Sequence, residues 1–148
     1  MNQNANSTAQ PNLSVVDSMA QLSFLVHGIL GRVGAEHDLS IIQIRLLGIL
    51  RDHEPSMLQL AQHLSLDKSS ITGLIDRAAR RGLVERIPSP TDRRGFQVRV
   101  TDAGRKLIDE SGEEIIRQLS AAAGVLSEDE QAQFAALATR IIGAGSTP

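Results

Sequence analysis

The chain of 148 residues has no cysteine, no tryptophan and no tyrosine, and it has only three phenylalanines. Without cysteine, disulfides, thiolate metal ligands, a thiolate nucleophile and a thiol redox switch are all excluded. The shortage of aromatic side chains disfavours the stacking platforms that hold single-stranded nucleic acids. The composition, with 41% hydrophobic and 22% charged residues, is typical of a soluble folded protein of one domain or two small lobes.

Long apolar runs are also missing, since no stretch approaches the roughly 18 residues that a membrane helix needs. The apolar stretch 24–29 is interrupted at His27. Residues 1–12 are rich in Asn, Gln, Ser and Thr and lack the basic start and apolar centre of a secretion signal. We therefore expect residues 1–12 to be a flexible tail and the protein to be cytoplasmic, with no membrane segment.

Several helices are predicted from apolar spacing and capping patterns. Apolar residues recur at three- and four-residue steps over 13–36, which predicts a long helix with a wide apolar stripe. The patterns Ser-x-x-Gln at 40–43 and 56–59 match capping boxes and predict helices over 40–53, before Pro55, and over 56–63. Helices are also predicted over 101–123 and, after a capping box at 127–130, over 127–142.

The central segment predicts a winged helix-turn-helix. Asp67 is the expected N-cap of a helix that runs to about Gly82, with Ile71, Leu74, Ile75 and Ala78 buried. A short turn joins it to the helix over 56–63, as in a helix-turn-helix. Strands over 83–87 and 96–100 then flank a turn-rich loop. The predicted fold is mainly α with a small β-hairpin.

The charge of the chain is unevenly distributed. Residues 67–106 hold ten Lys/Arg and five Asp/Glu, a local net charge of +5, whereas the other residues hold five basic and twelve acidic side chains, a net of −7. Neutralising phosphates and releasing counterions is the main source of affinity for DNA, so a basic segment on an acidic body favours a duplex DNA partner.

The helix after Asp67 has the polar order expected of a helix in the major groove. Hydroxyls near its start can approach phosphates and base edges, and Arg77 is long enough to reach a guanine. The alternative is a solvated helix face with an ion pair such as Asp76 with Arg80. The residues predicted to be exposed are Lys68, Ser69, Ser70, Thr72, Gly73, Asp76, Arg77 and Arg80.

The loop between the strands carries Arg93 and Arg94 beside Gly95. Such a loop, or wing, can enter the minor groove, whose negative potential attracts arginine. Asp92 is placed to orient the Arg94 side chain by a bidentate pair. The alternative is a plain solvated turn.

Three stretches together resemble the multiple antibiotic resistance regulator (MarR) family of bacterial transcription factors: DKSSITGLIDR at 67–77, RGLVERIPSPTDRR at 81–94 and VRVTDAGR at 98–105. The resemblance implies a homodimer that binds a palindromic operator. It implies a DNA-binding lobe over 40–101 and dimerisation helices over 13–36 and 102–148. The wide apolar stripes of the terminal helices favour a dimer independently. Asp92 and Arg94 match the wing's Asp-x-Arg pair, and Ser69, Ser70, Thr72 and Arg77 match groove-facing positions. Gly73 departs from the family, in which we expect a longer side chain, and this leaves the base specificity open.

The resemblance also implies an effector, commonly a small aromatic or phenolic acid bound between the dimer core and the winged helix. We expect His27, Arg45 or Arg51 to meet its carboxylate. The alternative is that either arginine is a plain surface residue. The function predicted is a repressor that blocks polymerase and is released by its effector. The alternatives are a winged-helix protein-interaction module and a DNA-binding regulator without a ligand.

No metal site, cofactor or catalytic centre is predicted. His27, His37, His53 and His63 lie in different contexts without ligand-pair spacing. The sequence lacks a phosphate-binding glycine loop and a nucleophile with a matching base. Its acidic cluster over 109–114 is best explained as a solvated helix face.

Overall fold

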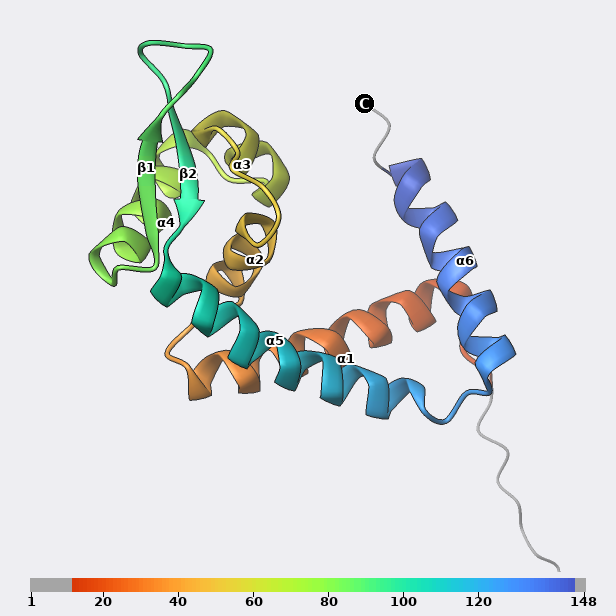
Figure 1. Ribbon diagram of the computed structural model, residues 1–148. Coiled ribbons are helices and arrows are strands. Elements are labelled where there is room, and N and C mark those ends of the chain that lie inside the picture. Colours follow the sequence, from red (N-terminus) through yellow and green to blue (C-terminus); the bar gives the residue numbers. More distant parts are fainter. Residues whose placement is uncertain (1–11, 146–148) are drawn as a thin grey trace, which may run out of the picture.

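The computed structural model describes residues 12–145, so most of the predicted tail lies outside the described residues. The described part contains helices and one hairpin (Figure 1). The fold prediction, mainly α with a small β-hairpin in a winged helix-turn-helix, is confirmed. The elements are α1 (Val15–Glu36), α2 (Ile41–Leu50), α3 (Met57–Leu64), α4 (Lys68–Arg80), β1 (Val84–Pro88), β2 (Phe96–Val100), α5 (Asp102–Ala123) and α6 (Glu128–Gly145).

Side-chain caps fix where the helices begin. The capping boxes predicted at Ser40, Ser56 and Ser127 are confirmed, because each serine accepts from a backbone N–H three residues on and the side chain there accepts from the serine N–H. Asp67 and Thr101 cap α4 and α5 with a single backbone hydrogen bond each, accepting from the N–H of Ser70 and Gly104. The helices of the winged lobe are thus specified by local sequence.

The lobe core lies between α2, α3, α4 and the hairpin. The stripe predicted for α4, made of Ile71, Leu74, Ile75 and Ala78, is confirmed as buried. On α2, Leu46, Leu47 and Leu50 are buried, whereas Ile41 and Ile44 are only half-buried. This helix contacts α1 and α5 as well as the lobe, so its burial does not follow a single stripe.

The hairpin is antiparallel, with Val84 opposite Val100 and Pro88 opposite Phe96. Val98 and Val100 are buried, but Phe96 is 51% exposed because it lies at the loop end of the hairpin, beyond the core. A third segment joins the sheet, since Val98 N–H donates to the Pro55 carbonyl (2.9 Å). The chain must be extended at Pro55 to make this bond, which explains why α2 ends at Leu50 rather than near His53 as predicted.

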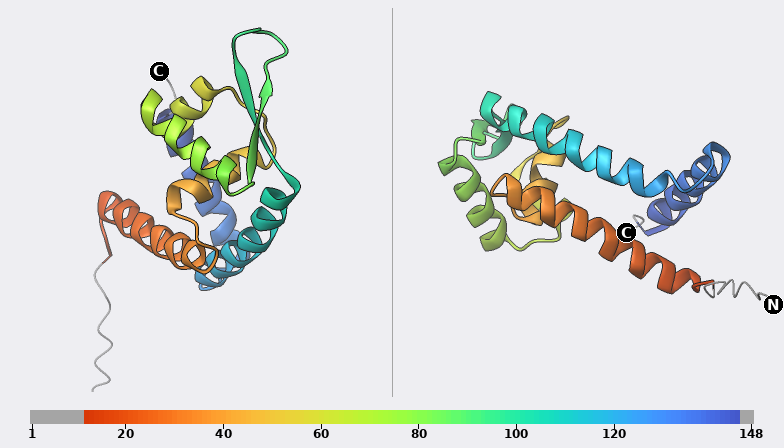
Figure 2. Two further views of the ribbon diagram at one scale, coloured as in Figure 1. Left: turned by 90° about the vertical axis from the view of Figure 1, so that its left-hand side faces the viewer. Right: turned by 90° about the horizontal axis from the view of Figure 1, so that it is seen from below.

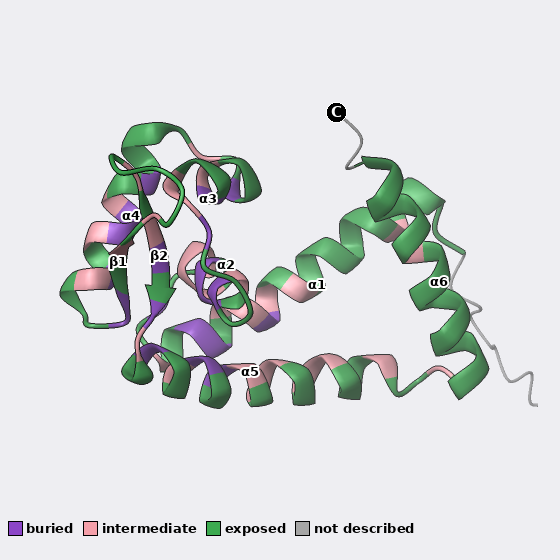
Figure 3. Ribbon diagram, turned by 45° about the horizontal axis from the view of Figure 1, so that its top comes forward, coloured by how far each residue is buried: buried purple, intermediate pink, exposed green. Residues whose placement is uncertain are grey.

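Outside the lobe, α1 and α5 run side by side in opposite directions, and α6 projects away from the far end of α5 (Figures 1 and 2). Burial is concentrated in the lobe and in the nearby ends of α1 and α5 (Figure 3). The far half of α1 and all of α6 expose large apolar side chains. Within residues 12–145 no helix is long and apolar enough to cross a membrane.

The first turn of α5 approaches the start of β1 at a glycine. A Cβ added at Gly104 would lie 2.1 Å from the Leu83 carbonyl oxygen and 2.6 Å from Val100 Cγ2. Because a carbonyl of the main chain cannot move aside without shifting β1, α5 and the hairpin can only meet at this angle if residue 104 has no side chain.

We predict that Gly104→Ala lowers the free energy of unfolding by roughly 1–3 kcal/mol, as expected of overpacking. Gly112→Ala on the same helix is the matched control, because its Cβ would meet nothing within 4 Å. That control should gain up to about 1 kcal/mol from helix propensity. Urea unfolding followed by circular dichroism measures both, and equal effects would contradict the proposed contact.

Candidate nucleic-acid interface

The start of α4 is fixed by Asp67. Its Oδ1 accepts from the Ser70 backbone N–H (2.7 Å) and from the Ser69 hydroxyl (2.8 Å). The Ser70 N–H, followed by the Ser69 hydroxyl, lowers the pKa of Asp67 below its ordinary value. The cap is therefore an anion near neutral pH, and it holds the first turn of the helix in one conformation.

Two of the hydroxyls predicted to face the groove already donate hydrogen bonds within the protein. Ser69 donates to Asp67, and Thr72 Oγ1 donates to the Lys68 carbonyl one turn back (2.8 Å). Their oxygens remain as acceptors, whereas phosphates and the guanine edge need donors. Donation to DNA from this helix therefore falls mainly to Lys68 and the arginines.

The acidic residue of α4 is paired with the hairpin. Asp76 accepts from Arg86 of β1 (2.5 Å), so the predicted alternative pair of Asp76 with Arg80 is wrong. Arg86 is ten residues away in sequence and reaches Asp76 only because β1 packs against α4. The pair connects the helix to the wing and leaves both Arg77 and Arg80 without a carboxylate partner in residues 12–145.

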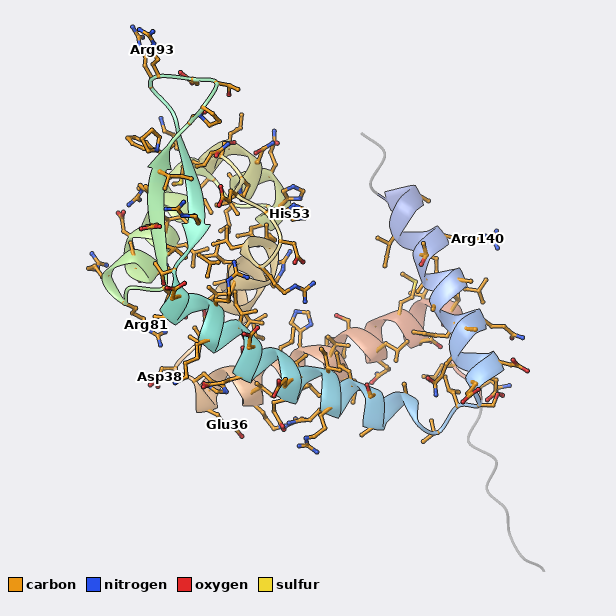
Figure 4. The ribbon with its side chains drawn as sticks, in the orientation of Figure 1. Glu36, Asp38, His53, Arg81, Arg93 and Arg140 are labelled. Atoms are coloured by element: carbon orange, nitrogen blue, oxygen red, sulfur yellow. The ribbon has the colours of Figure 1, made fainter. Side chains whose placement is uncertain are left out.

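The wing turn is held by its own backbone. The Ser89 N–H donates to the Gly95 carbonyl (3.0 Å). Asp92 Oδ1 accepts from the Arg94 backbone N–H (3.0 Å), so the predicted bidentate pair with the Arg94 guanidinium is wrong. Asp92 shapes the turn, and the guanidinium groups stay unpaired. Arg93 points away from the body of the protein at the tip (Figure 4).

The basic side chains of residues 67–106 form two groups, which differ in whether they have an ion-pair or hydrogen-bond partner. One group is committed: Arg86 and Arg99 form ion pairs, Lys106 lies 3.8 Å from Glu110, and Arg81 and Arg105 donate to backbone carbonyls. The other group has no partner among the described residues. We call it the α4–wing cations: Lys68, Arg77, Arg80, Arg93 and Arg94.

All five α4–wing cations are exposed, and all lie on α4 or on the wing turn. Every predicted cationic DNA contact belongs to this group. Arg80 also belongs to this group, although it was not among the DNA contacts predicted from the sequence. Its exposure was predicted, but its freedom from Asp76 depends on the Arg86 pair, which no local pattern indicates.

The residues predicted to bind an effector fall in different places. Arg45 and Arg51 line a hollow of about 850 Å³ beside the loop between α2 and α3, together with His53 and His63. Arg51 also borders a smaller, largely apolar crevice of about 440 Å³ between α1, α2 and α5. His27 lines neither of them; its Nδ1 lies 2.8 Å from the Ser23 carbonyl oxygen of its own helix.

The remaining groups considered from the sequence are the histidines and the acidic cluster of α5. Among residues 12–145 no group of three His, Asp or Glu side chains is placed to hold a metal ion. In the acidic cluster of α5, Glu110 lies near Lys106 and Glu114 pairs with Arg117 (2.6 Å). The bond from Arg117, with a second from Gln118, lowers the pKa of Glu114 to about 2. Glu110 and Glu114 therefore interact with basic side chains of their own helix.

Comparison with known proteins identifies the family of the chain. Residues 37–95, from the end of α1 to the wing, match the model of the MarR family. The chain is 30% identical over 127 residues to the uncharacterized HTH-type transcriptional regulator YkoM of Bacillus subtilis, covering 85% of this chain and 81% of that protein. The chain belongs to the MarR family.

Solved structures share the fold of this MarR-family protein. The DNA complex of Staphylococcus aureus MepR superposes with a TM-score of 0.75 at 19% identity, covering 90% of this chain and 99% of that one. NadR in complex with 4-hydroxyphenylacetate gives a TM-score of 0.74 at 21% identity, covering 95% and 97%. At these identities the likeness establishes the fold alone.

Proposed function

We propose that this protein binds duplex DNA in a sequence-specific manner and regulates transcription, with α4 in the major groove and the wing turn in the adjacent minor groove. The observation that carries the proposal is the separation of charge: the five unpartnered cations of residues 67–106 all lie on these two elements. Membership of the MarR family supports it, and MepR, which shares the fold, has been crystallised with DNA. We infer a cytoplasmic location on the nucleoid.

The protein is further proposed to act as a homodimer. The far half of α1 exposes Met19, Leu22 and Leu25, and α6 exposes Phe134, Leu137 and Ile141. Monomeric proteins rarely leave such large apolar side chains in water on neighbouring elements. A two-fold axis covers the same surface on both chains at once, and the paired lobes then match a palindromic operator. Repression follows if the operator overlaps the site where polymerase binds.

An effector site is proposed in the crevice between α1, α2 and α5. Its walls include Leu30, Leu47 and Ile108. Arg51 supplies a cation at its edge, where it pairs with Asp52 (2.8 Å), and the carboxylates of Asp109 and Glu113 also line the crevice. A largely apolar crevice with a guanidinium at its edge suits an aromatic or phenolic carboxylic acid, because the ring is buried while the carboxylate takes the place of Asp52 beside the arginine. NadR, which shares the fold, has been solved with 4-hydroxyphenylacetate.

We predict that Arg77→Ala lowers the affinity for a selected operator by about 1–3 kcal/mol and relaxes the preference at one base position. Arg94→Ala should weaken binding to all sequences alike and reduce the salt dependence. Fluorescence anisotropy with duplexes recovered from a random library measures both effects. Arg140→Ala is the control, since this arginine lies on α6, far from the lobe (Figure 4). Parental affinity in both variants would place the DNA surface elsewhere.

We predict that Leu137→Glu shifts the protein from dimer to monomer at micromolar concentration, because a carboxylate would be buried at the subunit interface. Sedimentation equilibrium measures the shift. Gln133→Glu, on an exposed position of the same helix, adds the same charge and should leave more dimer intact. A parental protein that sediments as a monomer would refute the proposed dimer.

We predict that one or more compounds in a panel of aromatic and phenolic acids release the protein from its operator, and that Arg51→Ala raises the concentration needed. Arg45→Ala is the matched control, because Arg45 lines the larger hollow and is not among the residues that line the crevice. If Arg45→Ala reduced the response as well, the effector would bind in the larger hollow, which both arginines line. A flat response across the panel would favour a regulator without a ligand.

A further inference from the structure

Gly73 lies in the middle of α4, on the side of the helix that is exposed to solvent between Ser69 and Arg80. Glycine is, after proline, the least favourable residue for a helix interior. The φ of Gly73 does not lie in the left-handed region, so the backbone does not require glycine here. The reason for glycine must therefore be sought in the space that a side chain would occupy.

That space is occupied by Arg77. A Cβ on Gly73 would lie 3.2 Å from Arg77 Nη1, which shows that the arginine folds back over the glycine, one turn along the helix. Beside it lies a recess of about 260 Å³ between α4 and the start of α2. Ile42, Leu66 and Leu74 contribute apolar walls, Gly73 contributes bare backbone, and the polar lining consists of Ser69, Ser70 and Arg77. An apolar recess with a guanidinium at its rim is thus part of the helix proposed to contact bases.

From this arrangement we infer that the Gly73 recess receives the 5-methyl group of a thymine that neighbours a guanine bound by Arg77. In the major groove the thymine methyl is the apolar feature of the base edges, and the O6 and N7 atoms of guanine are the acceptors that suit arginine. The apolar walls of the recess match the thymine methyl group, and the Arg77 guanidinium matches the guanine acceptors. This inference rests on the proposed function, because it requires α4 to enter the major groove.

Continuity with the α4–wing cations favours DNA as the occupant over a free small molecule. Arg77 is both a member of that group and the rim of the recess. Phosphates attracted by Lys68 and Arg80 on the same helix would hold the bases against this face of α4. A Cβ at position 73 would lie 3.2 Å from Arg77 Nη1, so even the smallest side chain would crowd the guanidinium at the rim of the recess. Gly73 therefore determines specificity by leaving room for a base substituent.

The experiment replaces thymines in a recovered operator by deoxyuridine, one at a time, which removes the methyl group and nothing else. Full-length parental protein should lose about fourfold in affinity at one thymine per half-site, the change expected for one buried methyl. That thymine should neighbour a guanine whose replacement by 7-deazaguanine weakens the parental protein but not Arg77→Ala. Fluorescence anisotropy at fixed salt measures each duplex.

Gly73→Ala is the decisive variant. Alanine raises helix propensity, and the atom it meets is the mobile end of a side chain, so the variant should fold. It should bind thymine and deoxyuridine duplexes equally. Gly48→Ala on α2 is the control, because its Cβ meets nothing within 4 Å, and it should keep the parental fourfold difference.

Three results would overturn the inference. The first is that deoxyuridine lowers the affinity at none of the thymines. The second is that Gly73→Ala still distinguishes thymine from deoxyuridine. The third is that benzoate competes equally with the thymine and deoxyuridine duplexes, and that this competition is lost in Gly73→Ala. The last would mean that the recess holds an organic acid instead. If the protein recovers no duplex from the library, the proposed function fails, and this result is distinct from binding without methyl discrimination.

Discussion

Burial of one stripe of α4 is the constraint on which the rest of the structure depends. Ile71, Leu74, Ile75 and Ala78 are held in the lobe core, so the helix can present only its opposite face to a partner. The Asp67 cap fixes its start, and the Asp76–Arg86 pair fixes its position relative to the wing. A rigid helix costs little conformational entropy on binding, because its face is already organised.

The lobe is in turn tied to the helices that carry it. Arg81, at the end of α4, donates to the carbonyls of Asp38 (2.6 Å) and His37 (3.2 Å) in the corner between α1 and α2. Asp38 adopts a left-handed conformation there, which this residue type tolerates better than most. Arg81 therefore holds the end of α4 against the corner between α1 and α2, although it belongs by sequence to the basic segment. Any change in the angle between α1 and the lobe, such as one caused by a ligand between α1, α2 and α5, would be transmitted through this corner to α4.

Features that depend on neighbours in sequence were predictable from the sequence. The serine capping boxes, the Asp67 cap and the α4 stripe all follow from spacings of three or four residues. Features that depend on packing between distant segments were not. Asp76 pairs with Arg86 rather than Arg80 because β1 lies against α4, and the extended chain at Pro55 joins a sheet formed some 40 residues later in the sequence. The Asp92 prediction was wrong for a local reason. In this tight turn the carboxylate accepts from the Arg94 backbone N–H, two residues away, and not from the long Arg94 side chain. The free state of Arg80 and the recess at Gly73 likewise become visible only in three dimensions.

The most direct test of the account is amide hydrogen exchange of the full-length protein, measured with and without a recovered operator duplex. The account requires new protection in residues 68–73 and in residues 92–95 of the wing, with no change in residues 128–145 of α6. Protection confined to α6 or to the loop between α2 and α3, with α4 and the wing unaffected, would contradict it.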